Sequence, residues 1–341
     1  MKRLTITAVL LLLLALSIGC ASRNPYVTGG IIDMQQSRYR AAEEQFKKAL
    51  ELEPNNSDAH MWLGKSYASQ RKYVEAAGAF DEALSINPAH QSEVDNETYF
   101  YWAVYYNAGL ALSDSMQWET AGKFLKRAIE VLPDSVGPYA QLSYAYTKQD
   151  KAEEAESILR AAIEKAPDNM AVRVSLARLK IRDKEYDEAR ALLEEATAKD
   201  PENAEAHYYL GLVFSSLKNN EKAEQSFAQA ASLDSANKDA FFNLAFTRMS
   251  LQKYAEAVES FSRVVELEET DEEAWMYLGM CYYQVGNYDM AIKAFDGVLG
   301  LNPKNGDAYI QRGYAKQKKG FKNEAYEDIE YGNKLNKEQG N

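Results

Sequence analysis

The chain has 341 residues, of which 51 are acidic and 39 are basic, so its formal net charge at pH 7 is −12. A body of this charge is repelled by nucleic acid and by anionic lipid headgroups, which excludes both as partners of the folded part. Hydrophobic residues make up 46% of the sequence, which is ample for a packed core. With only two cysteines, Cys20 and Cys281, no disulfide framework is expected.

The N-terminus has the composition of a secretory leader. Met1-Lys2-Arg3 is a short basic segment, and residues 4–18 form an uncharged apolar run. That run is short for a membrane span and has the length of a signal-peptide core. It ends in Leu-Ser-Ile-Gly-Cys, which resembles a bacterial lipobox. The resemblance implies a signal peptide over residues 1–19, acyl chains such as palmitate on Cys20, and a short lipidated tether over residues 20–25.

Two other interpretations of the leader stay open: a plain secretory signal cut near Gly19 or Ala21, and an uncleaved anchor. Several acyl chains would hold the protein durably on a membrane, so we expect membrane contact through the lipid only. Ala21, rather than Asp, follows the cysteine. By resemblance to Gram-negative lipoproteins, this implies the bacterial cell envelope, at the periplasmic face of the outer membrane.

Residues 272–305 show the unit from which the rest of the chain is built. Apolar and small residues fall at helical spacing in two stretches, so the unit predicts two short helices. Gly286-Asn287 supplies the turn between them, and Pro303 stops the second helix. Small residues, Gly279 and Ala291, stand where the two helices must touch. One such hairpin cannot hide its apolar face and therefore needs neighbours.

The unit recurs along the chain with a fixed period. Alanines equivalent to Ala291 are 34 residues apart, with one interval of 45, and a large apolar residue follows each alanine by four. These alanines are Ala42, Ala76, Ala121, Ala155, Ala189, Ala223, Ala257, Ala291 and Ala325. The period, with its Leu-Gly, Tyr, Ala, Phe and Pro positions, resembles the tetratricopeptide repeat family. The resemblance implies an all-α fold, a right-handed α-solenoid of about nine helix-turn-helix hairpins.

We expect a single solenoid over residues 26–341 with one insertion, 91–101. The repeats lie near 24–56, 57–90, 102–135, 136–169, 170–203, 204–237, 238–271, 272–305 and 306–339. Gly29-Gly30 should weaken the first helix of the first repeat. In the last repeat Glu324, Glu327, Asp328 and Glu330 are expected to face water, as a terminal cap requires.

The insertion runs into Trp102 without turn residues, so we expect it to extend the first helix of the third repeat. Its aromatic residues, Tyr99-Phe100-Tyr101, support two interpretations. They pack on the second repeat, or they form a ledge for a partner.

No residue pattern indicates catalysis. The three histidines are scattered, and no metal, nucleophile or phosphate-loop motif is present. Acidic residues recur at the start of first helices, at Asp58, Glu205, Asp239, Glu273 and Asp307, where they complement the helix dipole. Cys281 is expected to be a buried, inert thiol. We therefore expect no enzyme, no cofactor and no bound metal.

The surface offers a binding site instead. Counted from the first residue of each repeat, positions 2, 5, 9 and 12 share one face of the first helix, which lines the concave wall in the resembled family. Position 9 lacks the Asn of many peptide-binding members, so a clamp for chaperone tails is not expected. The predicted apolar, aromatic partner groove comprises Tyr106, Leu110, Tyr144, Tyr208, Leu212, Phe242, Phe246, Met276, Met280, Tyr283, Ile310 and Tyr314.

Arg178 and Arg182 interrupt the groove in the fifth repeat. They either pair with acids of adjacent repeats or receive an acidic group of the partner. The functional prediction is a membrane-anchored periplasmic scaffold that binds a protein or peptide partner and assists assembly of an envelope complex. The alternative is a self-associating structural element, a homo-oligomer whose groove is filled by another copy or by its own chain.

Overall fold

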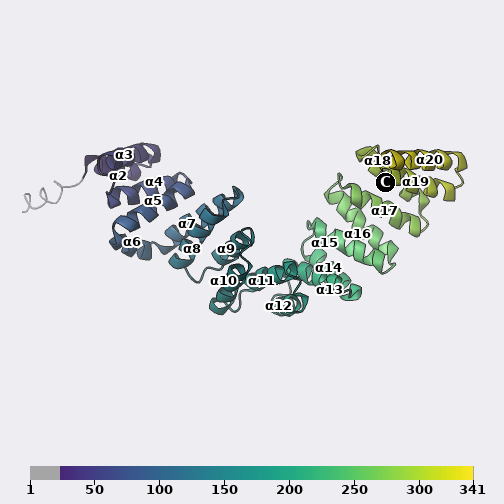
Figure 1. Ribbon diagram of the computed structural model, residues 1–341, viewed down its shortest axis with the longest axis horizontal. Helices are drawn as coiled ribbons and strands as arrows, with labels where there is room; N and C mark the ends of the chain where they lie inside the picture. The colour runs from purple at the N-terminus through teal and green to yellow at the C-terminus, as the bar shows by residue number, and fades with distance from the viewer. Residues whose placement is uncertain (1–23, 341) are drawn as a thin grey trace, which may run out of the picture. The chain divides into compact units, whose positions relative to one another are not determined.

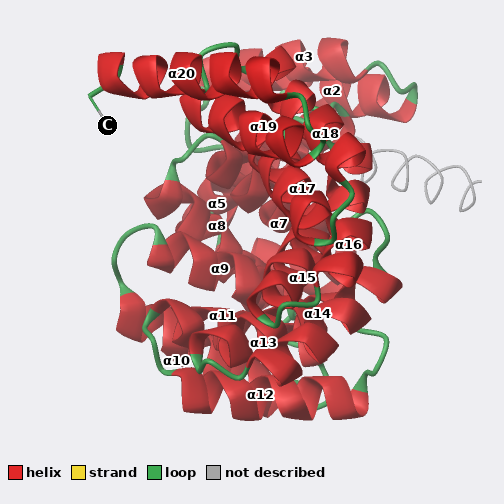
Figure 2. Cartoon of the chain, turned by 90° about the vertical axis from the view of Figure 1, so that its right-hand side faces the viewer, coloured by secondary structure: helices red, strands yellow, loops and turns green. Residues whose placement is uncertain are grey.

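The computed structural model describes residues 24–340, so the predicted signal peptide and Cys20 lie outside the described residues. Within them the regular structure is helical throughout, in nineteen α-helices and one short 3-10 helix, with no strand (Figures 1 and 2). The expected fold class, an all-α solenoid of helix-turn-helix hairpins, is confirmed. No helix within residues 24–340 combines the length and the apolar character that crossing a membrane requires.

The chain divides into two compact units at residue 168, and each is described by itself. The helices of the first unit are α2 (Pro25–Gln35), α3 (Tyr39–Leu52), α4 (Ser57–Ser69), α5 (Tyr73–Ile86), η1 (Pro88–His90), α6 (Gln91–Asn96), α7 (Thr98–Asp114), α8 (Trp118–Val131), α9 (Gly137–Thr147) and α10 (Ala152–Lys165).

The second unit consists of five hairpins. Its helices are α11 (Met170–Arg182), α12 (Tyr186–Lys199), α13 (Ala204–Ser216), α14 (Asn220–Leu233), α15 (Lys238–Ser250), α16 (Tyr254–Leu267), α17 (Glu272–Gln284), α18 (Tyr288–Leu301), α19 (Gly306–Lys318) and α20 (Lys322–Glu338). Each second helix packs on the first helix of its own hairpin and on that of the next, and Figure 2 shows α13–α14, α15–α16 and α17–α18 stacked in order.

The two helices of a hairpin touch where the sequence places small residues. A Cβ atom added at Gly279 would lie 2.5 Å from a ring carbon of Phe295, so the ring occupies the space of the missing side chain. Gly30 stands in the same relation to Phe46, also at 2.5 Å. Gly30 therefore lets α2 and α3 meet closely. The helix α2 is formed over this stretch, although Gly29-Gly30 is expected to weaken it.

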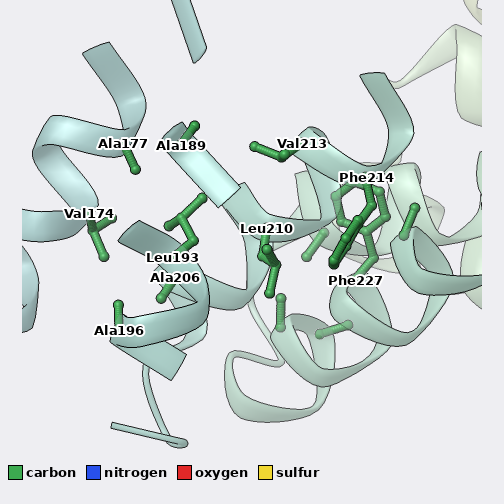
Figure 3. Packing of buried hydrophobic residues seen from close by; sticks show 14 of the residues in the cluster. Val174, Ala177, Ala189, Leu193, Ala196, Ala206, Leu210, Val213, Phe214 and Phe227 are labelled. Carbon is green, nitrogen blue, oxygen red and sulfur yellow. The ribbon is translucent and has the colours of Figure 1, made fainter. Parts of the chain in front are cut away.

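The repeating alanines form the centre of the core. All nine are at most 2% exposed, and the large residue four positions later is fully buried or nearly so in the first eight repeats. Figure 3 shows how α11, α12, α13 and α14 contribute to one cluster, with Leu193, Leu210 and Phe227 among small side chains. The buried surface is thus continuous from hairpin to hairpin within a unit.

Each hairpin turn contains one residue with left-handed backbone geometry. Gly286 and Gly320 hold this place in the last two repeats, with φ of 80° and 89°. In the other seven it is held by Ser37, Arg71, Met116, Asp150, Lys184, Lys218 and Gln252, with φ between 57° and 62°. Most of the turns therefore carry the steric cost of a side chain in this region.

Residues 91–101 form a short helix, α6, and the beginning of α7, with a break at Glu97. The insertion therefore extends the first helix of the third repeat only from Thr98. Tyr101 is fully buried with its ring 4.8 Å from that of Phe80 on α5, as the packing interpretation expected. Tyr99 is 75% exposed and makes no such contact, so the alternative of a ledge concerns this residue and the partly exposed Phe100.

The last repeat differs from expectation at Asp328, which is buried while Glu324, Glu327 and Glu330 are exposed. Its carboxylate accepts two hydrogen bonds from Arg312, at 2.7 and 2.8 Å, and pairs with Lys316 at 2.9 Å. Although burial alone would raise the pKa of Asp328, these two partners lower it. A buried ion pair therefore occupies the last hairpin where the sequence suggested a water-facing residue.

The turn geometry gives the first testable prediction. Gly286→Ala places a side chain at φ 80° and should lower the free energy of unfolding of its hairpin by about 1 kcal/mol. The matched control is Gly300→Ala in the same hairpin, where a Cβ would meet no atom within 4 Å. The control should raise stability by about 0.5 kcal/mol, since alanine favours a helix over glycine. Hydrogen exchange of α17 and α18 amides measures both changes; equal effects of the two substitutions would contradict the assigned turn.

Candidate functional site

Nine of the predicted groove residues form one band on the first helices of the second unit. We call this band the apolar stripe; it consists of Tyr208, Leu212, Phe242, Phe246, Met276, Met280, Tyr283, Ile310 and Tyr314. They come from α13, α15, α17 and α19, at positions 5, 9 and 12 of their repeats. The first helices α17 and α19 contact one another directly, and rings on α15 and α17 meet, which brings the stripe positions of these helices side by side. None of the nine is fully buried.

Aromatic rings join α15 to α17 in the middle of the apolar stripe. The Tyr277 ring lies 6.0 Å from Phe242 and 5.7 Å from Phe246, both edge to face. It also stacks on the buried Phe261 at 5.5 Å. Phe246 keeps 47% of its surface exposed despite these contacts. The rings are therefore fixed in position and still present apolar surface to water.

The two ends of the apolar stripe are held in similar ways. At the α13 end, Tyr208 contacts Tyr209 at 5.3 Å and the buried Phe227 at 6.0 Å. At the other end, Ile310 lies against Gly332 of α20, where a Cβ atom would be 2.8 Å away, and Tyr314 is 42% exposed.

Three further residues lie between these ends on α17. Met276, Met280 and Tyr283 pack with their inner atoms on a cluster of Ala291, Phe295 and Ala315. They remain partly exposed. Unbranched methionine side chains adapt to irregular apolar partners.

The remaining three predicted apolar residues belong to the first unit. Tyr106 stacks on Trp102 at 5.3 Å, and Tyr144 meets Trp118 edge to face at 5.6 Å. Tyr106 and Trp118 pack on the same small core cluster. Tyr144 is 42% exposed and Leu110 is partly exposed. The first unit thus has its own, smaller apolar surface.

Both arginines of the predicted groove have acidic neighbours in the structure. Arg178 is 3.4 Å from Glu205 of the next repeat and lies over the Tyr209 ring, 5.3 Å from its centre. Arg182 pairs with Asp183, the next residue in the chain, at 2.8 Å. Arg178 thus pairs with an acid of the adjacent repeat, as one interpretation expected, whereas the acid next to Arg182 belongs to its own repeat. Both side chains stay accessible, with exposures of 47% and 39%.

Two site residues were missed at position 6 of the repeat, Tyr209 and Tyr277. The sequence contained the signal, because position 6 lies one helical turn from positions 2 and 9. Tyr277 is the residue that joins Phe242 to Phe246 through ring contacts. Its omission followed from defining the face by positions 2, 5, 9 and 12, which leaves out position 6.

Histidine and cysteine side chains outside the apolar stripe have structural roles. The rings of His60 and His207 lie 2.9 and 3.1 Å from the carbonyl oxygens of Pro54 and Pro201, the same contact in two repeats. Cys281 is fully buried, and burial raises the pKa of its thiol to about 12, which suppresses the reactive thiolate. Within residues 24–340 no cluster of His, Cys, Asp or Glu has the arrangement of a metal site.

Comparison with known families identifies the repeat. Four models, each described as tetratricopeptide repeat, match this chain in several places. The matched segments are 28–90, 112–179, 148–213, 180–245, 239–271 and 272–305. Together they cover most of the chain, including every helix that carries the apolar stripe except α19.

Individual relatives are distant. BBSome complex member BBS4 of Xenopus tropicalis is 29% identical over 124 residues, which are 36% of this chain and 20% of that protein. The chain therefore matches about a fifth of that relative's length. The match is too short to transfer the function of the whole relative.

Two solved structures are similar to parts of this chain. A structure described as Pseudomonas aeruginosa pilF has a TM-score of 0.53 and 20% identity, covering 61% of this chain and 94% of that one. YrrB, described as a TPR protein with an unusual peptide-binding site, has a TM-score of 0.46 and 21% identity, covering 57% and 97% of the two chains. The similarity to the pilF structure supports the fold and nothing finer.

The exposure of the apolar stripe gives the second prediction. Phe246→Ala should cost less than about 1 kcal/mol of stability, because nearly half of the ring is already in water. Phe261→Ala, one helix away and fully buried, should cost about 3–5 kcal/mol through the cavity it leaves. Urea unfolding followed by circular dichroism compares the two. If both substitutions cost the same, Phe246 is part of the core and not spare surface.

Proposed function

Since the chain belongs to the tetratricopeptide repeat family, we propose that it is a scaffold that binds a protein or peptide partner along the apolar stripe. The observation that supports this most is the row of partly exposed aromatic and methionine side chains on four successive first helices. Phe246 and Tyr314 alone keep 47% and 42% of their surface in water. Contiguous apolar surface of this kind marks interaction sites in soluble proteins.

The rings of the apolar stripe are suited to binding because they are already ordered. Phe242 and Tyr277 both pack on the buried Phe261, which limits their rotamers before any partner arrives. An ordered aromatic surface loses little conformational entropy on association, so more of the contact energy appears as affinity. Aromatic and methionine residues are also enriched at the centres of interfaces. The proposed role needs no catalytic group.

The location of this scaffold is proposed from the sequence. The lipobox-like segment ending at Cys20 supports a protein tethered by lipid at the periplasmic face of the outer membrane. A tethered scaffold of this family would hold a partner near the membrane during assembly of an envelope complex. Self-association, in which a second copy covers the apolar stripe, is the competing use of the same surface.

Partner capture tests the docking role. The double variant Phe246→Asp with Met280→Asp should lose partners that the unaltered protein retains, because two carboxylates would have to be desolvated in the interface. The matched control is Leu233→Asp with Leu301→Asp, which changes two half-exposed residues of second helices. Circular dichroism confirms that each variant is folded. Identical partner sets for both variants would contradict the role of the apolar stripe, and a dimer in sedimentation that only the stripe variant loses would favour self-association.

Removal of the predicted acylation site tests the anchor. Cys20→Ser should move the protein from the membrane fraction to the soluble periplasmic fraction, because no thiol remains to carry acyl chains. Cys281→Ala removes the other cysteine and should leave the protein on the membrane. Fractionation followed by immunoblotting reports both results. A Cys20→Ser protein that stays with the membrane would show that something other than this lipid anchors it.

A further inference from the structure

A row of acidic side chains runs beside the apolar stripe. We call Glu205, Asp239, Glu273 and Asp307 the acidic row. Each is exposed and occupies the first turn of its helix, on α13, α15, α17 and α19. Each precedes a stripe residue by three positions, so the helical repeat places acid and apolar side chain next to each other on one surface. The acidic row therefore borders the apolar stripe along its length.

Most of this negative charge is not neutralised within residues 169–340. Asp239 and Glu273 form no ion pair there with a lysine or arginine, and Asp307 accepts a hydrogen bond from the neutral Asn336 at 2.8 Å. Glu205 has Arg178 at 3.4 Å, both exposed. By contrast, Glu224 on α14, away from the stripe, lies 2.6 Å from Lys253 and 3.3 Å from Arg248. The protein pairs acids elsewhere and leaves the acidic row largely open.

The negative charge of the acidic row acts on tyrosine rings within and beside the apolar stripe. Burial and the carboxylate of Glu273 both raise the pKa of the Tyr277 phenol. Burial, Asp239 and the neighbouring Tyr209 raise the pKa of Tyr208 in the same way. Asp239 and Glu273 belong to successive repeats, and each disfavours the charged form of a nearby phenol. A positively charged group resting on these rings would be favoured for the same reason.

The fold does not require acids at this place. The equivalent residues of the preceding repeats are Ala103, Gly137 and Ala171, and α7, α9 and α11 form without them. Helix formation therefore does not depend on these acids, although each favours its own helix end through the helix dipole. The opposite border of the stripe, at position 13, carries Ser216, Ser250, Gln284 and Lys318, so the acidic border is on one side only.

The width of the apolar stripe favours a helical occupant. From Met276 through Met280 to Tyr283 there are seven residue steps along α17, which is about 10 Å at 1.5 Å per step and close to the diameter of an α-helix. Side chains of neighbouring first helices meet across the stack, as Phe246 and Tyr277 do, and for an axis separation of about 10 Å one repeat corresponds to about seven residues of a helix lying across the stack. Such a helix would meet one member of the acidic row every two turns.

Building on the function proposed above, we infer that the partner segment is an amphipathic helix whose apolar face covers the apolar stripe and whose Lys or Arg side chains, about seven residues apart, face the acidic row. The apolar face supplies contact area, and the charges set orientation, because they fit on one border only.

Synthetic helices test this inference with the full chain. Three labelled peptides of about 20 residues, long enough to cross the four repeats, share one leucine face. They carry lysine, glutamine or glutamate at every seventh position beside that face. Fluorescence anisotropy should give the tightest binding for the lysine peptide, roughly tenfold above the glutamate peptide, with a difference that shrinks as salt is raised.

Charge variants locate the effect. Asp239→Asn with Glu273→Gln should weaken the lysine peptide about three- to tenfold and leave the glutamine peptide unchanged. The matched control, Glu194→Gln with Glu259→Gln, removes two exposed charges from second helices and should change neither peptide. Circular dichroism checks that both variants are folded.

The outcomes separate the two levels of the hypothesis. Equal binding of all three peptides, abolished by Phe246→Asp with Met280→Asp, would overturn the basic helix and keep the docking role. A lysine preference unchanged by Asp239→Asn with Glu273→Gln would overturn the acidic row as its cause. Binding that survives the stripe variant would overturn the docking role together with the inference.

Discussion

The structure depends on close contact between the two helices of each hairpin, made where a small residue of the first helix faces a large residue of the second. At Gly64 and Gly279 the rings of Phe80 and Phe295 occupy the space a side chain would need. This contact leaves no gap to be filled, so it fixes the register of the two helices. Repeated through a unit, it aligns the same positions of successive first helices.

This constraint separates the residues that the packing of the hairpin requires from those that it does not require. The face of the first helix that meets the second helix is committed to packing, whereas position 9 is only partly covered, since Phe246 and Tyr314 keep 47% and 42% of their surface exposed. Lys65, Arg178 and Phe246 all occupy position 9, and the hairpin forms around each. Apolar residues at this position from α13 to α19 are therefore not explained by the fold, and an interaction with another molecule gives them a reason.

The repeat period was sufficient to predict the positions of the hairpins and of their buried alanines. The alanine spacing located the hairpins, and each alanine is buried. Gly30, Tyr277 and Asp328 were misjudged or missed because their roles depend on a specific neighbour. Gly30 accommodates Phe46, Tyr277 links two phenylalanines across repeats, and Asp328 is held by Arg312. A period gives the face on which a residue lies but not the side chain it meets there.

The stacking of parallel first helices also decides the sign of charge along the border of the apolar stripe. The N-terminus of every first helix lies at this border, and the helix dipole there is equivalent to about half a positive charge. Without acids this border would be positive and would favour an acidic partner segment. One carboxylate per repeat exceeds the dipole charge, so Asp239 and Glu273 reverse the sign of the border. The one carboxylate per repeat that stabilises each helix end therefore also selects the charge of the partner segment that binds beside it.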